Sequence, residues 1–233
     1  TLIDLGGFQT AFLALAALPL ASLAVARFVP HERHAATPST APRQSSWNLL
    51  REPGFARLLL VNWLLSSSWD VHSFLVPILG HERGFSASAI GLILGVFASS
   101  VALVRLAIPV IAHRLREAHV LVVSMLTCAA VFAVYPLARS SWVMGGCAVV
   151  LGLALGAVQP MVMATLHQIT PVARHGEAIA LRSMAINFSS ATMPLAFGVA
   201  GATLGASAVF WLMAAAVASG SLAARQVGAA KAA

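Results

Sequence analysis

The stretch HVLVVSMLTCAAVFAVYPLA (119–138) is 20 residues long and contains no Asp, Glu, Lys or Arg. A helix of this length rises about 30 Å, which matches the hydrocarbon core of a bilayer. The stretch does not alternate apolar and polar residues, as a strand of an outer-membrane barrel would. A helix also satisfies its backbone amides internally, as lipid requires. The stretch therefore predicts a membrane-spanning helix.

Similar apolar stretches lie on both sides of it. They cover 8–29, 54–79, 88–112 and 142–167, and a final run of 48 residues covers 178–225. The final run is too long for one helix, and GATLG (201–205) offers a turn, so we divide it into 178–200 and 206–224. Ser86 or Ser88 is an expected N-cap of the helix at 88–112. The sequence predicts an all-α polytopic bundle of about seven transmembrane helices.

The composition supports a membrane protein. Of the 233 residues, 59% are hydrophobic and 9% charged, with mean hydropathy +0.88, whereas soluble domains are about half apolar and a quarter charged. In a soluble protein, a net charge of +7 would indicate binding to nucleic acid. Here the basic residues lie between apolar stretches, so we expect no nucleic-acid partner. Cys128 and Cys147 lie inside those stretches without metal-ligand spacing, so we expect no metal and no cofactor.

The basic residues are distributed unequally between alternate loops, ten on one side and two on the other. The richer side faces the cytoplasm in membrane proteins. This predicts that the segment 30–52 and the C-terminus are cytoplasmic. The richer side holds Arg27, Arg33, Arg43, Arg51, Arg57, Arg114, Arg116, Arg174, Arg225 and Lys231, and the other side holds Arg83 and Arg139.

The segment 30–52 contains Pro30, Pro38 and Pro42 among Ser and Thr residues, which is typical of a linker. It divides the chain into a first helix (1–29), a linker (30–52), a six-helix bundle (53–226) and a tail (227–233). No signal-peptide pattern follows Thr1. We expect the chain to have been cut from a longer one.

One span, a long basic linker and six further spans resemble the second half of a major facilitator superfamily transporter. VRLAIPVIAHRLRE (104–117) resembles the family's basic loop between helices eight and nine, with His113-Arg114 in place of the usual Asp-Arg. GEAIALRSMAINFSSATMPLAFGVAGATLG (176–205) is similar to helix eleven of bacterial efflux-type members.

The resemblance implies that the stretch 8–29 is helix six and that 54–225 holds helices seven to twelve. It implies alternating access between two halves, with a small organic solute bound where they meet. It further implies proton-linked export, as in efflux antiporters of the bacterial inner membrane. The partners would be the solute, a proton, the lipid bilayer and a missing N-terminal half or second subunit. The protein would not be an enzyme.

Asp70 is the only carboxylate deep inside a predicted span, roughly 14 Å from its outer end. Removal from water favours the neutral form of a carboxyl group, which suits a residue that carries a coupled proton. We therefore expect Asp70 on a proton or substrate pathway. The alternatives are a structural partner for a buried Arg, or a shallower position.

Polar residues share this helix with Asp70. Asn62, Ser66 and Trp69 follow i, i+4, i+7 spacing and form a stripe that should face a cavity, and His72 lies on the same helix. Hydrogen bonding between helices is the alternative. Gln159, beside Pro160, and Asn187 are further pathway candidates, with helix packing as the alternative.

Five charged residues are expected to have structural or gating roles. Arg105 lies roughly 10 Å inside its span, where it can extend to the interface. Arg182 begins a span near Glu177, and Arg114 and Arg116 belong to the basic loop. The glycines of GLILG (91–95), GLALG (152–156) and FGVAGATLG (197–205) predict close helix packing.

The rival interpretation is a membrane scaffold or an intramembrane enzyme subunit without transport activity. An enzyme needs paired catalytic groups at one depth, which a lone Asp70 does not supply. A scaffold predicts no water-filled cavity.

Overall fold

The computed structural model describes residues 45–111 and 115–229, with isolated positions between 13 and 27. The chain divides into two units, Thr1–Arg43 and Gln44–Ala233. The predicted first span at 8–29 falls mostly outside the described residues. The same holds for most of the linker, whose last residues form a 3-10 helix, η1 (Ser46–Arg51). Arg114 of the basic loop also lies outside them.

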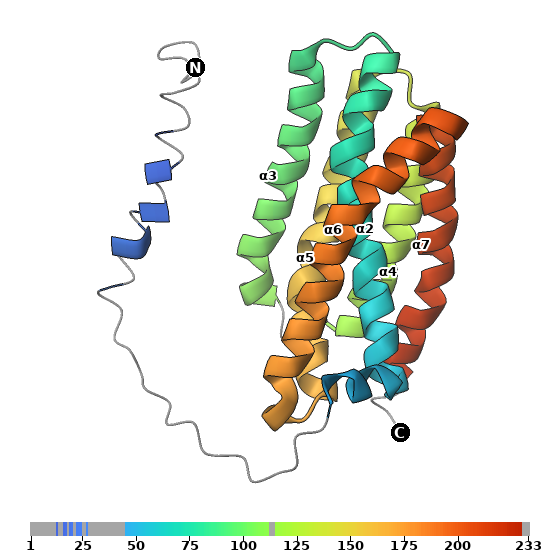
Figure 1. The fold of residues 1–233 in the computed structure, drawn as a ribbon. Coiled ribbons are helices and arrows are strands. Elements are labelled where there is room, and N and C mark those ends of the chain that lie inside the picture. Colours follow the sequence, from blue (N-terminus) through green and yellow to red (C-terminus); the bar gives the residue numbers. More distant parts are fainter. Residues whose placement is uncertain are drawn as a thin grey trace. The chain divides into compact units, whose positions relative to one another are not determined.

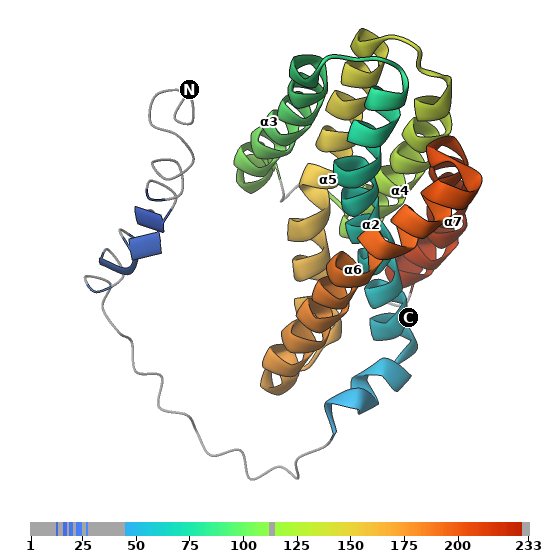
Figure 2. The same ribbon diagram turned by 45° about the horizontal axis from the view of Figure 1, so that its top comes forward.

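The second unit is a bundle of long helices (Figures 1 and 2). No strand occurs within 45–111 or 115–229, which confirms the predicted all-α fold. Each predicted stretch from 54 onward corresponds to one helix, with ends that differ by a few residues. The helices are α2 (Pro53–Glu82), α3 (Ala87–Ile111), α4 (Glu117–Val134), α5 (Ser141–Ile169), α6 (His175–Leu204) and α7 (Ala206–Ala229).

The helices differ in how apolar they are. By length and composition, four can cross a membrane: α3, α5, α7, and α4 together with the 3-10 turn that continues it to Leu137. Their mean hydropathies lie between 1.6 and 2.3. The helices α2 and α6 do not meet the same test, because polar residues interrupt their apolar sequence.

The helix ends follow local sequence signals. The Ser86 hydroxyl accepts a hydrogen bond from the Ala89 backbone N–H at 3.2 Å, so Ser86 is the cap that begins α3. Gly205 has φ +84°, a conformation that side chains disfavour, and it separates α6 from α7 at the predicted GATLG turn.

Helices α3 and α5 approach closely at two glycines. A Cβ atom at Gly152 would lie 2.6 Å from the Phe97 carbonyl oxygen, and one at Gly156 would lie 2.9 Å from Val104 Cβ. The predicted close packing at GLALG is therefore confirmed. The helical glycines of GLILG and FGVAGATLG differ, because a Cβ atom added to any of them would meet no described atom within 4 Å. These glycines are Gly91, Gly95, Gly198 and Gly201.

Arg83 holds one end of the bundle together. It follows α2 and donates hydrogen bonds to the backbone carbonyls of Tyr135 at 3.1 Å and Pro136 at 2.6 Å, just beyond α4. A cation beside the C-terminal carbonyls of a helix is also electrostatically favourable. The α2–α3 turn is thus fixed to the connection between α4 and α5.

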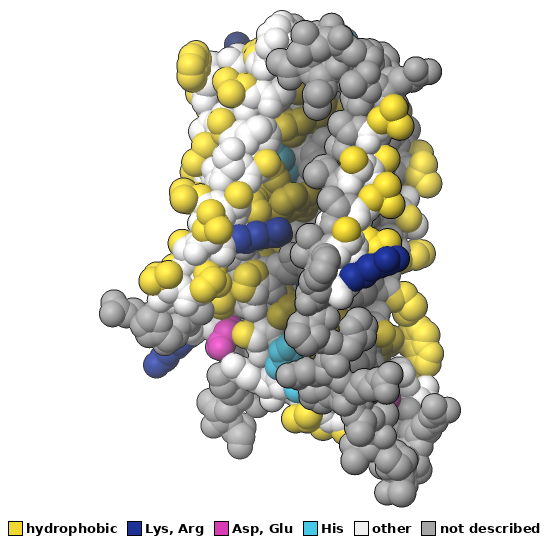
Figure 3. Space-filling model, turned by 90° about the vertical axis from the view of Figure 1, so that its left-hand side faces the viewer, with side chains coloured by type: hydrophobic (Ala, Val, Ile, Leu, Met, Phe, Trp, Pro, Cys, Tyr) yellow, Lys and Arg dark blue, Asp and Glu magenta, His cyan; other side chains and the backbone are white. Residues whose placement is uncertain are grey.

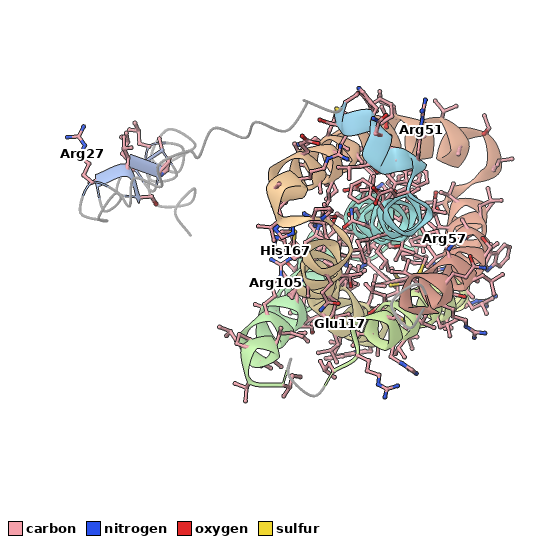
Figure 4. The ribbon with its side chains drawn as sticks, turned by 90° about the horizontal axis from the view of Figure 1, so that it is seen from below. Arg27, Arg51, Arg57, Arg105, Glu117 and His167 are labelled. Atoms are coloured by element: carbon pink, nitrogen blue, oxygen red, sulfur yellow. The ribbon has the colours of Figure 1, made fainter. Side chains whose placement is uncertain are left out.

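The opposite end carries most of the described charges. Figure 4 views the molecule from this end and labels Arg51, Arg57, Glu117 and His167, which come from η1, α2, α4 and α5. Between the ends, hydrophobic side chains are spread over the face shown in Figure 3. Exposed leucines such as Leu103 (63%) and Leu106 (78%) suit contact with lipid.

Candidate functional site

A cavity of about 260 Å³ lies between α2, α3, α5 and α6. All four helices supply polar or charged side chains to a lining that is otherwise apolar. The lining residues are Asn62, Leu65, Ser66, Trp69 and Asp70 of α2, Arg105 of α3, Leu155, Val158 and Gln159 of α5, and Arg182, Ile186 and Ser190 of α6.

The cavity lies against one face of α2. Asn62, Ser66, Trp69 and Asp70 are spaced so that they fall on the same side of a helix with 3.6 residues per turn. The predicted stripe of Asn62, Ser66 and Trp69 therefore lines the same cavity as Asp70. On α6, Arg182, Ile186 and Ser190 repeat every four residues and face it from the other side.

Arg182 is held inside the bundle. Its side chain is only 7% exposed, and its Nε atom donates a hydrogen bond to Asn62 Oδ1 at 3.2 Å. The Asn62 Nδ2 atom is buried without a partner within the described ranges. Glu177, near which the sequence placed Arg182, pairs with Arg174 at 2.9 Å instead. Arg182 is therefore a cavity residue.

Arg105 approaches the cavity from α3. One of its terminal nitrogens donates to Gln159 Oε1 at 3.1 Å, and its guanidinium carbon lies 6.0 Å from the centre of the Trp69 ring. This places a cation near an aromatic face, at the outer limit of a cation–π contact. Trp69 is supported in turn by an edge contact with Phe97 at 4.8 Å.

Asp70 is half-buried, and its two carboxylate oxygens lie 3.5 and 3.4 Å from the Ser190 hydroxyl. Among residues 45–111 and 115–229, neither Arg105 nor Arg182 forms an ion pair with it. The sequence left open that Asp70 neutralises a buried Arg. The described structure shows no such pair.

His72 and Asn187 lie apart from the cavity lining. His72 is fully buried: its Nδ1 atom is 3.1 Å from the Tyr135 hydroxyl, and its ring lies 4.1 Å from that of Phe97. Asn187 is exposed on α6, and Arg116 is exposed at the start of α4.

The sequence interpretation missed Ser190 and the apolar lining of α5. Ser190 follows Arg182 at i, i+8 on α6, and this spacing could have identified it once Arg182 was assigned to the cavity. Leu155 and Val158 give no sequence signal, because apolar residues occur throughout α5. In the described part of the chain, no group of three or more His, Cys, Asp or Glu is placed to hold a metal.

A family model described as Major Facilitator Superfamily matches residues 58–227, most of the chain. The match takes in all or most of each helix from α2 to α7. No curated protein matches the chain.

Proposed function

Because the chain belongs to the major facilitator superfamily, we propose that its bundle is one half of a proton-coupled exporter of a small organic solute. Membership places it among multi-pass membrane proteins that transport small solutes. Export by alternating access, proton coupling and the need for a second half are our proposals. So are the bacterial inner membrane and a cytoplasmic side holding the linker and the C-terminus.

The observation that carries the proposal is the cavity between α2, α3, α5 and α6. Charged groups inside a bilayer are costly and usually mark a transport pathway. Among the described residues, three charged groups line this cavity, Asp70, Arg105 and Arg182, and Asp70 is the only carboxylate of the three. The cavity therefore combines a proton-accepting group with cationic and apolar surfaces that can hold a solute.

Asp70 is the proposed coupling residue. Protonation of Asp70 changes the charge of the described lining from one net positive to two. A change of this size inside a low-dielectric bundle shifts the relative stability of two arrangements of the halves. In the charged state Ser190 stabilises the carboxylate from across the cavity.

The decisive experiment is Asp70→Asn in reconstituted vesicles that contain a pH-sensitive dye. We expect solute-driven proton movement to be lost while the protein remains folded, because the amide cannot exchange a proton. Glu82→Gln is the matched control, since Glu82 is an exposed carboxylate at the end of the same helix. Normal proton movement with Asp70→Asn would refute the role of Asp70.

A second experiment separates a transporter from a scaffold. Gln159→Cys, in a background with Cys128→Ala and Cys147→Ala, should react with a polar thiol reagent because Gln159 lines the cavity. Leu151→Cys on the same helix should not react, because Leu151 is 0% exposed. If neither cysteine reacts, the cavity is closed to water, as a scaffold predicts.

A further inference from the structure

We propose that the solute is a small organic anion: a carboxylate on an apolar, preferably aromatic, body, bound by Arg105 and Arg182 and by the Trp69 ring. This inference rests on the proposed transport function and names the substrate class of the same cavity.

The lining has an excess of positive charge. It contains the guanidinium groups of Arg105 and Arg182 and the carboxylate of Asp70. Neither guanidinium forms an ion pair within the described ranges, although Arg182 is only 7% exposed. A buried charge is costly without a partner of opposite sign. An anionic ligand would provide that partner.

The two guanidinium groups also retain free donors. Each has five N–H groups, and a carboxylate accepts two of them in parallel. Arg182 uses its Nε atom for Asn62, and the described residues show no acceptor for its two terminal nitrogens. Arg105 uses one terminal nitrogen for Gln159. The amide oxygens of Asn62 and Gln159 thus orient both groups beside the cavity.

The rest of the cavity suits an apolar body of limited size. Leu65, Leu155, Val158 and Ile186 line it together with the Trp69 ring. A volume of about 260 Å³ is slightly below the usual range for sites that hold drug-sized ligands. A single-ring acid fits this space, with its ring against Trp69 and its carboxylate toward the arginines.

Asp70 then has a defined effect on the anion. When charged, it repels a carboxylate bound in the same cavity, and a proton on Asp70 removes this repulsion. Among the described residues, the other charged groups facing the cavity are Arg105 and Arg182. His72 on the same helix faces Tyr135 and Phe97 instead, and α7, which also packs against α2, has only Arg225 near its end.

The proton and the anion therefore favour each other's binding. Ligands that bind together are carried in the same direction, whereas exchange requires them to compete for the site. The solute would leave together with a proton, down its own concentration gradient. This replaces the antiport mode that the family resemblance implies.

The test compares three ligands of nearly identical shape: benzoate, neutral benzamide and cationic benzamidine. Their binding to the full chain in lipid nanodiscs is measured by isothermal titration calorimetry. We expect benzoate to bind at least tenfold more tightly than benzamide, and benzamidine to bind most weakly. Lowering the pH should tighten benzoate binding in the unmodified chain but not in Asp70→Asn.

Single substitutions assign the charge effect to the cavity. Arg105→Gln and Arg182→Gln should each weaken benzoate binding about tenfold and leave benzamide binding nearly unchanged, because charge-assisted hydrogen bonds are lost. Arg139→Gln is the matched control, since Arg139 is exposed and lies outside the cavity. If Arg182→Gln fails to fold, the exposed Arg105 still provides the test.

The outcomes separate this inference from the proposed function. Equal affinity for benzoate and benzamide, tighter binding of benzamidine, or no saturable benzoate binding would overturn the anion assignment. Tight and selective benzoate binding supports it, even if vesicles show no transport, a result that would count against the proposed function alone. Transport restricted to neutral or cationic solutes would support the proposed transport function and overturn the anion assignment.

Discussion

Two helix pairs in this bundle are held together by different means. Helices α3 and α5 are both strongly apolar, and Gly152 and Gly156 bring their backbones into direct contact. Helices α2 and α6 are less apolar and meet through polar side chains. Asn62 contacts Arg182, and Ser67 contacts Ser189 at 3.1 Å. The first pair relies mainly on close backbone packing, with one hydrogen bond from Arg105 to Gln159 beside the cavity, whereas the second relies on polar contacts.

The difference indicates where lipid determines the sequence and where function does. Polar residues in a spanning helix must face protein or a water-filled space. In α2 and α6 they face each other and the cavity, which explains why these helices fail a simple apolarity test. We therefore regard α3–α5 as mainly a structural pair that also contributes Arg105 and Gln159 to the cavity, and α2–α6 as the pair that supplies most of its polar side chains.

The largest expected effect is on the structural pair. Gly152→Ala places a methyl group 2.6 Å from the Phe97 carbonyl oxygen, so α3 and α5 must separate. Overpacking of this kind costs about 1–3 kcal/mol. Thermal unfolding followed by circular dichroism should show reduced stability. Gly146→Ala on the same helix should be neutral or stabilising, because nothing lies within 4 Å of its added atom. Equal stability of both variants would contradict close packing.

The next effect concerns binding at the polar pair. The Asn62 Oδ1 atom lies 3.2 Å from Arg182 Nε, so Asn62→Asp places a carboxylate beside that guanidinium and compensates its charge. Benzoate binding should weaken about tenfold, or about 1.4 kcal/mol. Asn187→Asp adds the same charge to α6 at an exposed position outside the lining, and should change binding little. Similar losses in both variants would show a general charge effect and no specific role for Arg182.

The smallest expected effect concerns the hydrogen bond between Ser67 of α2 and Ser189 of α6. Ser67→Ala leaves the hydroxyl of fully buried Ser189 without its partner, which costs about 1 kcal/mol. The double variant Ser67→Ala and Ser189→Ala should recover most of this stability, since no unpaired group remains. Ser99→Ala, which removes an exposed hydroxyl from α3, is the control in the same unfolding measurement. Additive losses in the double variant would argue against a direct contact.

The helices were predictable because lipid imposes a length and an apolar composition on each. The stretches at 88–112 and 142–167 differ from α3 and α5 by two residues or fewer at either end. The polar face of α2 was predictable for a related reason, since residues at i, i+4 and i+7 share a side in any helix. These features depend only on local sequence.

The contacts across the cavity were not predictable in the same way. Arg182 and Asn62 are 120 residues apart, and nothing local indicates that they meet. Arg182 and Glu177 are near in sequence but form no ion pair, because residues five apart point in different directions on a helix. Arg174 is three residues from Glu177 and forms the pair instead. His72 lies outside the cavity lining, beside Tyr135 of the turn that follows α4, a contact that the local sequence does not indicate, and its role on a pathway stays a prediction.

The separation of 120 residues between Asn62 and Arg182 also has a consequence for biosynthesis. At about 5–20 residues per second, the ribosome needs roughly 6–24 s to make the second partner after the first. Asp70 and Ser190 are also 120 residues apart, so the same interval separates their synthesis. During that interval Asn62 and Asp70 of α2 lack their hydrogen-bond partners on α6. Unpaired polar groups are costly in lipid, so α2 is unstable there by itself. We expect α2 to remain in contact with the insertion machinery, or with water, until α6 arrives.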